Sequence, residues 1–277
     1  MAASPGSGPT SRPSCARRCR NPAGIVTAGP EAPGSFFGRR KGKALRAGQS
    51  ERVEHMLPQL RVPVPPRSME PHSAASHLGT LSVGLSEKTA LIDPRELFPV
   101  PPAEIWLESG FGGGEHLAHQ ARSHPDIGFI GVEPFVNGVA KLLGAIAEER
   151  LSNIRIWDDD ATQLLPVLMP ASLDRVYILY PDPWPKRRQR KRRFVSDETL
   201  AALARVMRPG AELRFATDID DYAGWVLARI ARSPDFAWEA TAPADWRCSW
   251  PGWPSTRYEQ KARREGRSSA YLTFRRL

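Results

Sequence analysis

The feature that most constrains the fold is a regular alternation of short apolar runs with longer amphipathic stretches, which begins at Glu104. This alternation predicts an α/β fold with a parallel sheet, because parallel strands need a crossover of a dozen or more residues, usually a helix. The expected strands are residues 104–108, 127–133, 153–157, 173–180, 211–218 and 269–276. The expected helices are residues 115–122, 134–150, 162–169, 196–207 and 219–230. Ligands of such sheets bind beyond the carboxyl ends of the strands, so the residues directly after each strand are the candidates for function.

Two of the expected helices carry terminal signals. Pro134 is expected near the first turn of its helix, where proline is tolerated. Ser196 or Asp197 is expected to cap the helix over 196–207, in a Ser-x-x-Glu type of start.

The chain before this pattern divides into two parts. Residues 1–35 are rich in Pro, Gly, Ser, Ala and Arg and lack periodicity, so we expect a disordered tail. Residues 36–102 are expected to form a basic N-terminal segment, a helix from about Gln49, and a proline-rich extended arm with a short strand near Leu91. The alternating pattern then predicts the main domain over residues 103–277.

The formal net charge of +9 and the isoelectric point near 9.9 indicate a polyanionic partner. No apolar run approaches the roughly 20 residues that span a bilayer, so nucleic acid is favoured over a membrane. Two of the three cysteines, Cys15 and Cys19, lie in the expected tail, and the third is Cys248. This distribution favours neither a disulfide framework nor a zinc site, and it predicts a protein of the reducing cytoplasm.

A glycine-rich turn, "ESGFGGG" at residues 108–114, follows the first expected strand. A dinucleotide fingerprint starting at Gly110 would need Gly or Ala at position 115, which is Glu. The run instead reads G-x-G-x-G over Gly110, Gly112 and Gly114, with Glu108 before it. This pattern favours S-adenosylmethionine, whose sulfonium and ammonium groups are attracted by a carboxylate. The alternative is an ordinary strand-to-helix turn.

Acids also follow the second and third expected strands. Glu133 stands where an acid binds ribose hydroxyls in nucleoside-binding α/β folds. Asp160, in "DDDA", is a candidate for contacting an adenine amino group. Either acid could instead be a solvated residue at a strand end. Because three successive strand ends carry an acid, a nucleoside cofactor is the favoured interpretation.

The fourth expected strand ends in "YPDPWPKRRQRKRRF", residues 180–194. Asp182 stands between two prolines, which restrict its backbone and suit a side chain that must be positioned for chemistry. The seven basic residues among 186–193 are expected to contact phosphates beside that site. The alternative for this run is a solvated charged loop.

Together these motifs resemble the bacterial-type tRNA (guanine-N7-)-methyltransferase family, over roughly residues 36–277. The segments occur in the order and spacing of that family: "FGRRKGKAL", "ESGFGGGEHL", "FIGVEPF", "DDDA", "YPDPWPKRRQRKRR", "FATD" and "TRYEQ". Ser109 departs from the family, which usually has Ile or a similar apolar residue there, and the tail before residue 36 has no counterpart.

The resemblance implies a Rossmann-like class I methyltransferase fold, with a mostly parallel seven-stranded sheet, helices on both faces and a reversed last hairpin. It implies that the acids and glycines described above bind S-adenosylmethionine: Glu108, Gly110, Gly112, Gly114, Glu133, Asp160 and Asp182. Asp182 is also the implied catalytic residue. The residues implied to bind the target nucleotide are Lys186, Asp218, Thr256, Arg257, Tyr258 and Glu259. The residues implied to contact RNA are Arg188, Gln189, Arg190, Lys191, Arg192 and Arg193.

The implied substrate is guanine 46 in the variable loop of tRNA. Guanine N7 has a free lone pair, so methylation there needs positioning and charge stabilisation rather than a strong base. A fixed carboxylate suits the cationic reacting groups, and a basic surface beside it brings in the RNA backbone. We expect a cytoplasmic monomer, with a homodimer as the alternative, and neither a metal ion nor a membrane partner.

Two other classes of protein stay open at this point. An NAD-dependent oxidoreductase is disfavoured by Glu115 and by the lack of a convincing catalytic His or Lys-Tyr arrangement. A non-catalytic RNA-binding module is disfavoured by the intact acids at the strand ends. His116 and His119 are expected on a solvated face of their helix, rather than as catalytic or metal-binding groups.

Overall fold

The computed structural model describes residues 38–63 and 90–277, and residues Phe36–Leu277 belong to one unit. The expected disordered tail and most of the expected proline-rich arm therefore lie outside the described residues. The strand expected near Leu91 is wrong: Ile92 makes only an isolated bridge to Leu168, and a 3₁₀ helix, η1 (Pro94–Leu97), follows it.

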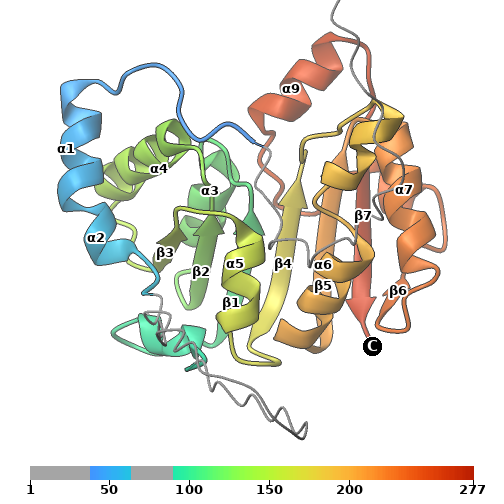
Figure 1. Cartoon of the computed structure of the whole chain (residues 1–277), viewed down its shortest axis with the longest axis horizontal. Helices are drawn as coiled ribbons and strands as arrows, with labels where there is room; N and C mark the ends of the chain where they lie inside the picture. Colours follow the sequence, from blue (N-terminus) through green and yellow to red (C-terminus); the bar gives the residue numbers. More distant parts are fainter. Residues whose placement is uncertain (1–37, 64–89) are drawn as a thin grey trace, which may run out of the picture. The chain divides into compact units, whose positions relative to one another are not determined.

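The described chain forms one seven-stranded sheet with the order β3-β2-β1-β4-β5-β7-β6 (Figure 1). The strands are β1 (Glu104–Ser109), β2 (Ile127–Val132), β3 (Ile154–Trp157), β4 (Leu173–Leu179), β5 (Met207–Thr217), β6 (Phe236–Trp238) and β7 (Ala270–Arg276). Strands β1 to β5 pair in parallel, whereas β7 is antiparallel to both β5 and β6. The mostly parallel seven-stranded sheet is confirmed, and its reversed edge makes the sheet mixed. The sequence analysis did not predict β6, which has only three residues.

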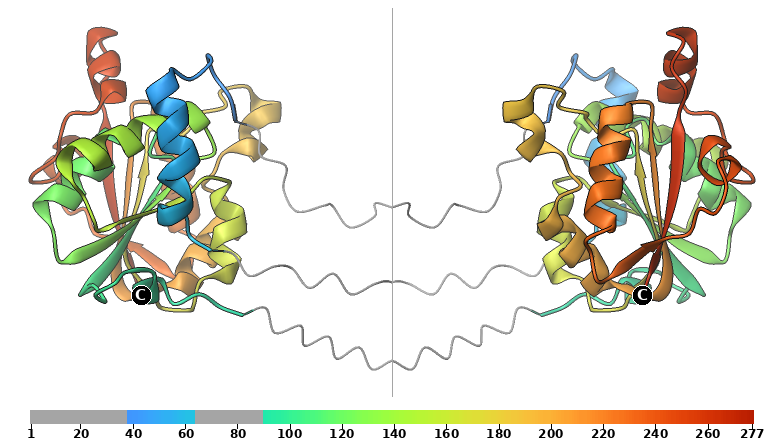
Figure 2. Two further views of the ribbon diagram at one scale, coloured as in Figure 1. Left: turned by 90° about the vertical axis from the view of Figure 1, so that its left-hand side faces the viewer. Right: turned by 90° about the vertical axis from the view of Figure 1, so that its right-hand side faces the viewer.

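Helices cover both faces of this sheet, with α3 and α4 on one side and α5 and α6 on the other (Figure 2). The helices are α1 (Ala47–His55), α2 (Leu57–Leu60), α3 (Glu115–Ser123), α4 (Val136–Glu149), α5 (Ala161–Leu164), α6 (Asp197–Val206), α7 (Asp220–Ile230), α8 (Ala244–Arg247) and α9 (Arg257–Arg264). Two further 3₁₀ helices are η2 (Leu165–Val167) and η3 (Arg187–Arg192). The short helix expected over 162–169 is therefore split between α5 and η2.

The structure refines two helix starts. Helix α4 begins at Val136 with Phe135 as its N-cap, so Pro134 lies near the first turn, directly before the N-cap. Ser196 caps α6, but the reciprocal partner is Thr199, whose hydroxyl accepts from the Ser196 amide at 2.8 Å. A threonine therefore takes the place that a glutamate has in the expected capping motif.

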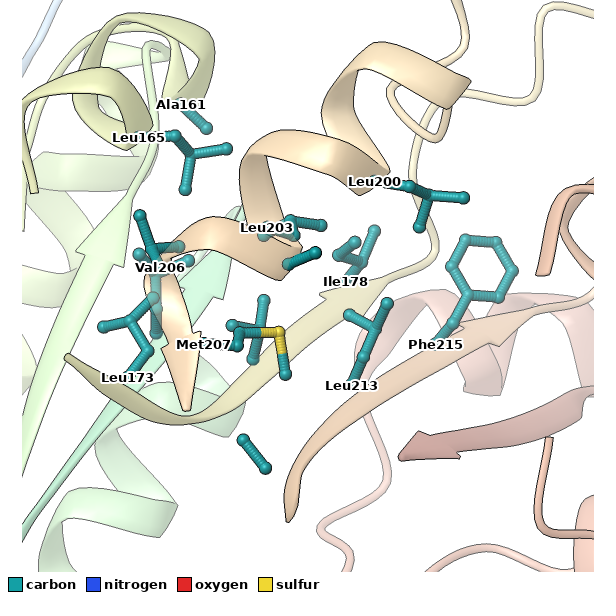
Figure 3. Packing of buried hydrophobic residues seen from close by; sticks show 14 of the residues in the cluster. Ala161, Leu165, Leu173, Ile178, Leu200, Leu203, Val206, Met207, Leu213 and Phe215 are labelled. Atoms are coloured by element: carbon teal, nitrogen blue, oxygen red, sulfur yellow. The ribbon is translucent and has the colours of Figure 1, made fainter. Parts of the chain in front are cut away.

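The alternation along each strand divides the core into two hydrophobic clusters. On β1, Ile105 and Leu107 pack into the cluster that α5, α6 and α7 complete, whereas Trp106 packs into the cluster of α3 and α4. Leu200 and Leu203 of α6 lie over β4 and β5 in the first cluster (Figure 3). Because both faces are buried, the central strands are largely apolar, as parallel strands between helix layers are, with Glu108 and Asp174 as buried charged exceptions on β1 and β4. Among the described helices, none is long and apolar enough to cross a membrane.

Candidate functional site

The strand order reverses between β1 and β4, because β2 and β3 extend the sheet from one side and β5 from the other. In a parallel sheet this reversal opens a crevice beyond the carboxyl ends of the two strands. The arrowhead of β4 in Figure 1 points to the end of the sheet near α9 and the segment that precedes α1. The fold therefore gathers the residues that follow β1, β2, β3 and β4 at one edge.

Three glycines give the turn after β1 its shape. Gly110, Gly112 and Gly114 have φ angles of 76°, 59° and 80°, in the left-handed region that other residues rarely adopt. A Cβ added to Gly110 would meet no atom within 4 Å, so open space adjoins the turn at this residue. Gly114 is the N-cap of α3 and directs the helix back over the sheet. The turn thus leaves room for a ligand to approach the backbone.

Glu133 holds this turn in place from the end of β2. Its Oε2 accepts a hydrogen bond from the Gly112 amide at 2.7 Å, and its Oε1 accepts one from the Phe135 amide at 2.9 Å. Burial raises the pKa of this carboxyl, and the two amide hydrogen bonds oppose that rise. Asp182 raises the pKa of Glu133 further and Arg257 lowers it, so both charges lie within electrostatic reach.

Glu108 is buried and pairs with a histidine. Its Oε2 lies 2.7 Å from Nδ1 of His116, and each residue is 3% exposed. The imidazole lies between the rings of Tyr177 and Trp253, at centroid distances of 4.7 and 4.9 Å. The expected solvated face is therefore wrong for His116, because α3 packs that side against the sheet and Trp253. His119 is half-buried, with Nε2 3.1 Å from the Gly252 carbonyl oxygen.

The three aspartates after β3 have three different partners. Asp158 accepts two hydrogen bonds from Arg61, at 2.8 and 2.6 Å, and Asp159 pairs with Arg40 at 2.7 Å. Asp160 caps α5 by accepting from the Thr162 amide at 3.0 Å. The first two acids therefore bind the N-terminal segment to the sheet. Asp160 is the one of the three that caps a helix, three residues after the end of β3.

The loop after β4 has a strained backbone on both sides of Asp182. Tyr180 and Trp184 have φ angles of 49° and 41°, and bulky residues seldom adopt such values. Strain of this kind persists only where the surrounding structure over-determines it, and it gathers at functional sites. Asp182 is exposed, and its carboxylate makes no hydrogen bond or ion pair within the described residues. Its charge is therefore available to a ligand.

The basic run after this loop divides into structural and exposed members. Arg193 is buried, and its guanidinium donates to the Pro183 carbonyl at 2.8 Å and to the Asp221 carboxylate. Arg190 also donates to Asp221, at 2.7 Å. The implied RNA contact of Arg193 is therefore wrong in this geometry, since its side chain has no exposed surface.

The exposed basic side chains of the run are Lys186, Arg187, Arg188 and Lys191. Gln189 is half-buried, and the guanidinium of Arg192 lies over the Trp184 ring at 5.1 Å. The short helix η3, which the sequence analysis did not predict, presents these groups beside Asp182.

The segment at the start of α9 contributes two kinds of side chain. Thr256 caps the helix, and Glu259, with no exposed surface, accepts from Trp253 Nε1 at 2.8 Å and from the Tyr271 hydroxyl at 2.6 Å. Burial would raise the pKa of Glu259, but the hydrogen bonds from Tyr271 and Trp253, together with Arg263, hold the pKa below its usual value. Glu259 thus anchors α9 to β7, whereas Thr256 caps the start of the helix.

Arg257 and Tyr258, which stand between Thr256 and Glu259, lie beside the glycine turn. A Cβ on Gly112 would lie 3.0 Å from Arg257 and 3.4 Å from Tyr258, so both adjoin the glycine turn. Tyr258 stacks on Tyr180 with a centroid distance of 6.4 Å. Asp218, after β5, accepts from Arg267 Nε at 2.7 Å. The described residues contain no group of three or more His, Cys, Asp or Glu side chains that could hold a metal ion.

Comparison with known proteins finds that the chain is similar to methyltransferases. A family described as "Putative methyltransferase" matches residues 102–272. A protein of Agrobacterium fabrum named "tRNA (guanine-N(7)-)-methyltransferase" is 51% identical over 240 residues, which are 87% of this chain and 94% of that protein. The protein of the same name from Rhizobium meliloti is 51% identical over 250 residues, 90% and 98% of the two chains. Among solved structures, the 16S rRNA methyltransferase KamB has a TM-score of 0.44 and 18% identity, over 64% of this chain and 89% of that one.

Proposed function

The chain belongs to the tRNA (guanine-N7-)-methyltransferase family, and we propose that it transfers the methyl group of S-adenosylmethionine to N7 of guanine 46 in the variable loop of tRNA. The observation that carries this proposal is the carboxylate of Asp182. It is exposed and has no hydrogen-bond or ion-pair partner among the described residues, at the reversal of strand order and directly before a basic loop.

The residues around the glycine turn fit S-adenosylmethionine. The open space beside Gly110 lets a ligand reach the backbone, and Glu133 lies at the same edge with one lone pair of each carboxylate oxygen outside the two amide hydrogen bonds. Asp160 would face the adenine, and Glu133 would receive the ribose hydroxyls. Glu108 would attract the ammonium group, either with its Oε1 or through the field of its buried charge, because Oε2 is engaged by His116.

When bound, S-adenosylmethionine supplies a methyl group on a positively charged sulfur. Guanine N7 carries a free lone pair, so the residues of this chain would have to position the base against that methyl group, and no side chain would have to remove a proton first. Methylation would leave the purine positively charged. Asp182 holds a negative charge at that place, and its fixed backbone means that little reorganisation is needed during the transfer.

The target nucleotide would lie between the β4 loop and the start of α9. Lys186 would meet a phosphate, while Arg257 and Tyr258 would line the base pocket opposite Gly112. Thr256, Glu259 and Asp218 would support the pocket without direct contact to the base. Glu259 is buried, and Asp218 is paired with Arg267. Arg188, Gln189, Arg190, Lys191 and Arg192 would form the RNA-contact surface, with the exposed members contributing most.

The experiment that tests this proposal is nucleoside analysis of tRNA transcripts after incubation with the protein and S-adenosylmethionine. We expect 7-methylguanosine in a transcript with guanine 46, and none in a matched transcript with 7-deazaguanine 46, which lacks the nucleophile. Methylation of both transcripts would show that the position is wrong, and methylation of neither would overturn the activity.

Two further measurements address the remaining classes of protein. Thermal unfolding with S-adenosylmethionine or NAD distinguishes a methyltransferase from an oxidoreductase, because only the preferred ligand raises the melting temperature. Binding of tRNA without any methyl transfer would favour a non-catalytic RNA-binding module. We also propose a cytoplasmic monomer, because guanine 46 of one tRNA can be served by the single crevice of one chain.

A further inference from the structure

Arg193 is the last residue of the basic run, yet its side chain faces inward. Its Nε donates to the Pro183 carbonyl at 2.8 Å, and its other nitrogens reach the carboxylate and the carbonyl of Asp221. The three acceptors surround one guanidinium that has no exposed surface. A single planar fork therefore connects the loop that carries Asp182 to the first turn of α7.

Aromatic rings of α7 fix the plane of that fork. The Arg193 guanidinium lies over the rings of Tyr222 and Trp225, at 4.7 and 5.0 Å from their centroids. The Trp225 indole donates to the Val195 carbonyl at 2.8 Å, and Arg229 lies over the same indole at 3.4 Å. Arg193 thus packs among groups that are themselves held by hydrogen bonds and stacking, which leaves the guanidinium one orientation.

The loop depends on such support. Tyr180 and Trp184 keep φ angles that are strained for bulky residues and that persist only where the surroundings impose them. Within the described residues, the bond from Arg193 to Pro183 is the one side-chain hydrogen bond that reaches the backbone of residues 181–185. Without it, the loop could relax away from the strained conformation, and Asp182 would move with the adjoining Pro183.

We infer that Arg193 is a positioning residue, which sets the place of the Asp182 carboxylate by tying the Pro183 carbonyl to Asp221. This inference rests on the proposed function and deepens it. The charge of Arg193 is matched by Asp221, so its influence on Asp182 is exerted through geometry. The basic run accordingly has two tasks, since its exposed members face RNA and its last member fixes the loop in front of them.

The test compares Arg193→Lys with Arg229→Lys in steady-state methylation of tRNA. Arg193→Lys keeps the positive charge, but a single ammonium group lacks the planar set of donors that bonds both the Pro183 carbonyl and the Asp221 carboxylate. We expect kcat to fall about 100-fold, the effect of a misplacement near 1 Å, with KM for tRNA and affinity for S-adenosylmethionine within a factor of about two. Arg229→Lys removes stacking on the other side of Trp225 without touching the loop, and it should leave kcat within a factor of about two.

A second measurement keeps the inference testable apart from activity. Hydrogen exchange at the Tyr180 amide, which donates to the Ala216 carbonyl at the start of this loop, should speed up at least about tenfold in Arg193→Lys and remain unchanged in Arg229→Lys. Normal kcat and unchanged exchange in a folded Arg193→Lys protein would overturn the inference. An equal loss of kcat in both variants would also overturn it, because the residue would then be a general support of α7. If the wild-type protein fails to methylate tRNA while the exchange difference appears, the proposed function fails and the role of Arg193 in holding the loop stands.

Discussion

The acids at the ends of β1, β2 and β3 differ from the acid after β4, although all four stand at the same edge of the sheet. Glu108, Glu133 and Asp160 each accept a hydrogen bond from a side chain or amide nearby. Asp182 accepts none within the described residues, and a strained backbone holds it in place. Three carboxylates therefore contribute to the structure of this edge, whereas the fourth has no hydrogen-bond or ion-pair partner among the described residues.

The comparison shows that residue type at a strand end does not reveal what a carboxylate does. An acid engaged by amides shapes the turn on which a ligand lies, so its removal should affect both binding and folding. An acid without partners stabilises nothing in the free protein, so its removal should affect only the reaction. The predictions below test this division, from the largest expected effect to the smallest.

Replacing Asp182 by asparagine should have the largest effect. The change keeps the shape of the side chain and removes the charge that stabilises the cationic reacting groups, so kcat should fall about 100-fold or more. Steady-state kinetics and thermal unfolding should show this loss without a lower melting temperature. Asp126→Asn, which neutralises an exposed acid before β2, is the matched control. If Asp182→Asn keeps its kcat and loses tRNA affinity, the carboxylate positions RNA and the division is wrong.

Replacing Glu133 by alanine should have the next largest effect. The variant loses the acceptor for Gly112 and Phe135 as well as a cofactor partner, so affinity for S-adenosylmethionine should weaken by roughly 1–3 kcal/mol. Calorimetric titration measures this affinity, and the melting temperature should fall in the same variant. Affinity for tRNA should stay nearly constant. The control is Glu148→Ala, an exposed carboxylate near the end of α4. Unaltered cofactor affinity would remove Glu133 from the site.

Neutralising the exposed part of the basic run should change RNA binding rather than chemistry. In the triple variant Arg187→Gln, Arg188→Gln and Lys191→Gln, the slope of log affinity for tRNA against log salt should flatten by about 2–3. Each lost phosphate contact leaves about one counterion on the RNA. Turnover at saturating tRNA should change little. The triple variant Lys141→Gln, Arg232→Gln and Arg247→Gln loses the same charge elsewhere. An equal flattening there would show that net charge, and not this loop, attracts tRNA.

The smallest effect is expected at Asp221, the acceptor for Arg190 and Arg193. The hydrogen bond from Arg193 holds the pKa of Asp221 below its usual value near 3.8. A folded-state pKa below the unfolded one gives stability that is present above the unfolded pKa and is lost as the pH falls through the folded pKa. Chemical denaturation at pH 7 should therefore show that the wild-type protein is modestly more stable than Asp221→Asn. The difference in the free energy of unfolding between the two proteins should shrink below about pH 4. A difference that stays constant with pH would exclude the Arg193–Asp221 pair as its source.

Much of the fold could be predicted from the sequence, because apolar strands between helices leave a clear pattern. The same pattern could not reveal β6 or α9. Three residues of "FAW" are too few to show a period, and "RYEQKARR" has almost no apolar face. Helix α9 is held by polar bonds of Glu259 to Trp253, just before the helix, and to Tyr271 in β7, and such bonds leave no periodic pattern in the sequence.

The sequence predicted which positions lie at the candidate site more completely than it predicted what each side chain contacts. Asp182 and the glycine turn follow from local sequence, since prolines and glycines restrict or free the backbone. The burial of His116 and Arg193 could not be predicted, because both depend on rings from other segments, at Trp253 and at Tyr222. A signal existed for Arg193, which directly precedes a half-buried phenylalanine and a buried valine, Phe194 and Val195.

The ion pairs between the N-terminal segment and the end of β3 have a consequence for the order of events during synthesis. Arg61 bonds to Asp158 across 97 residues, and Val62 donates to the Ile156 carbonyl. The ribosome therefore releases this arginine-bearing segment well before its partners exist, at a rate near 5–20 residues per second. The segment can make these contacts only after β3, the third strand in chain order, has been synthesised. Until then its cationic side chains remain exposed to the ribosomal RNA and messenger RNA around the emerging chain.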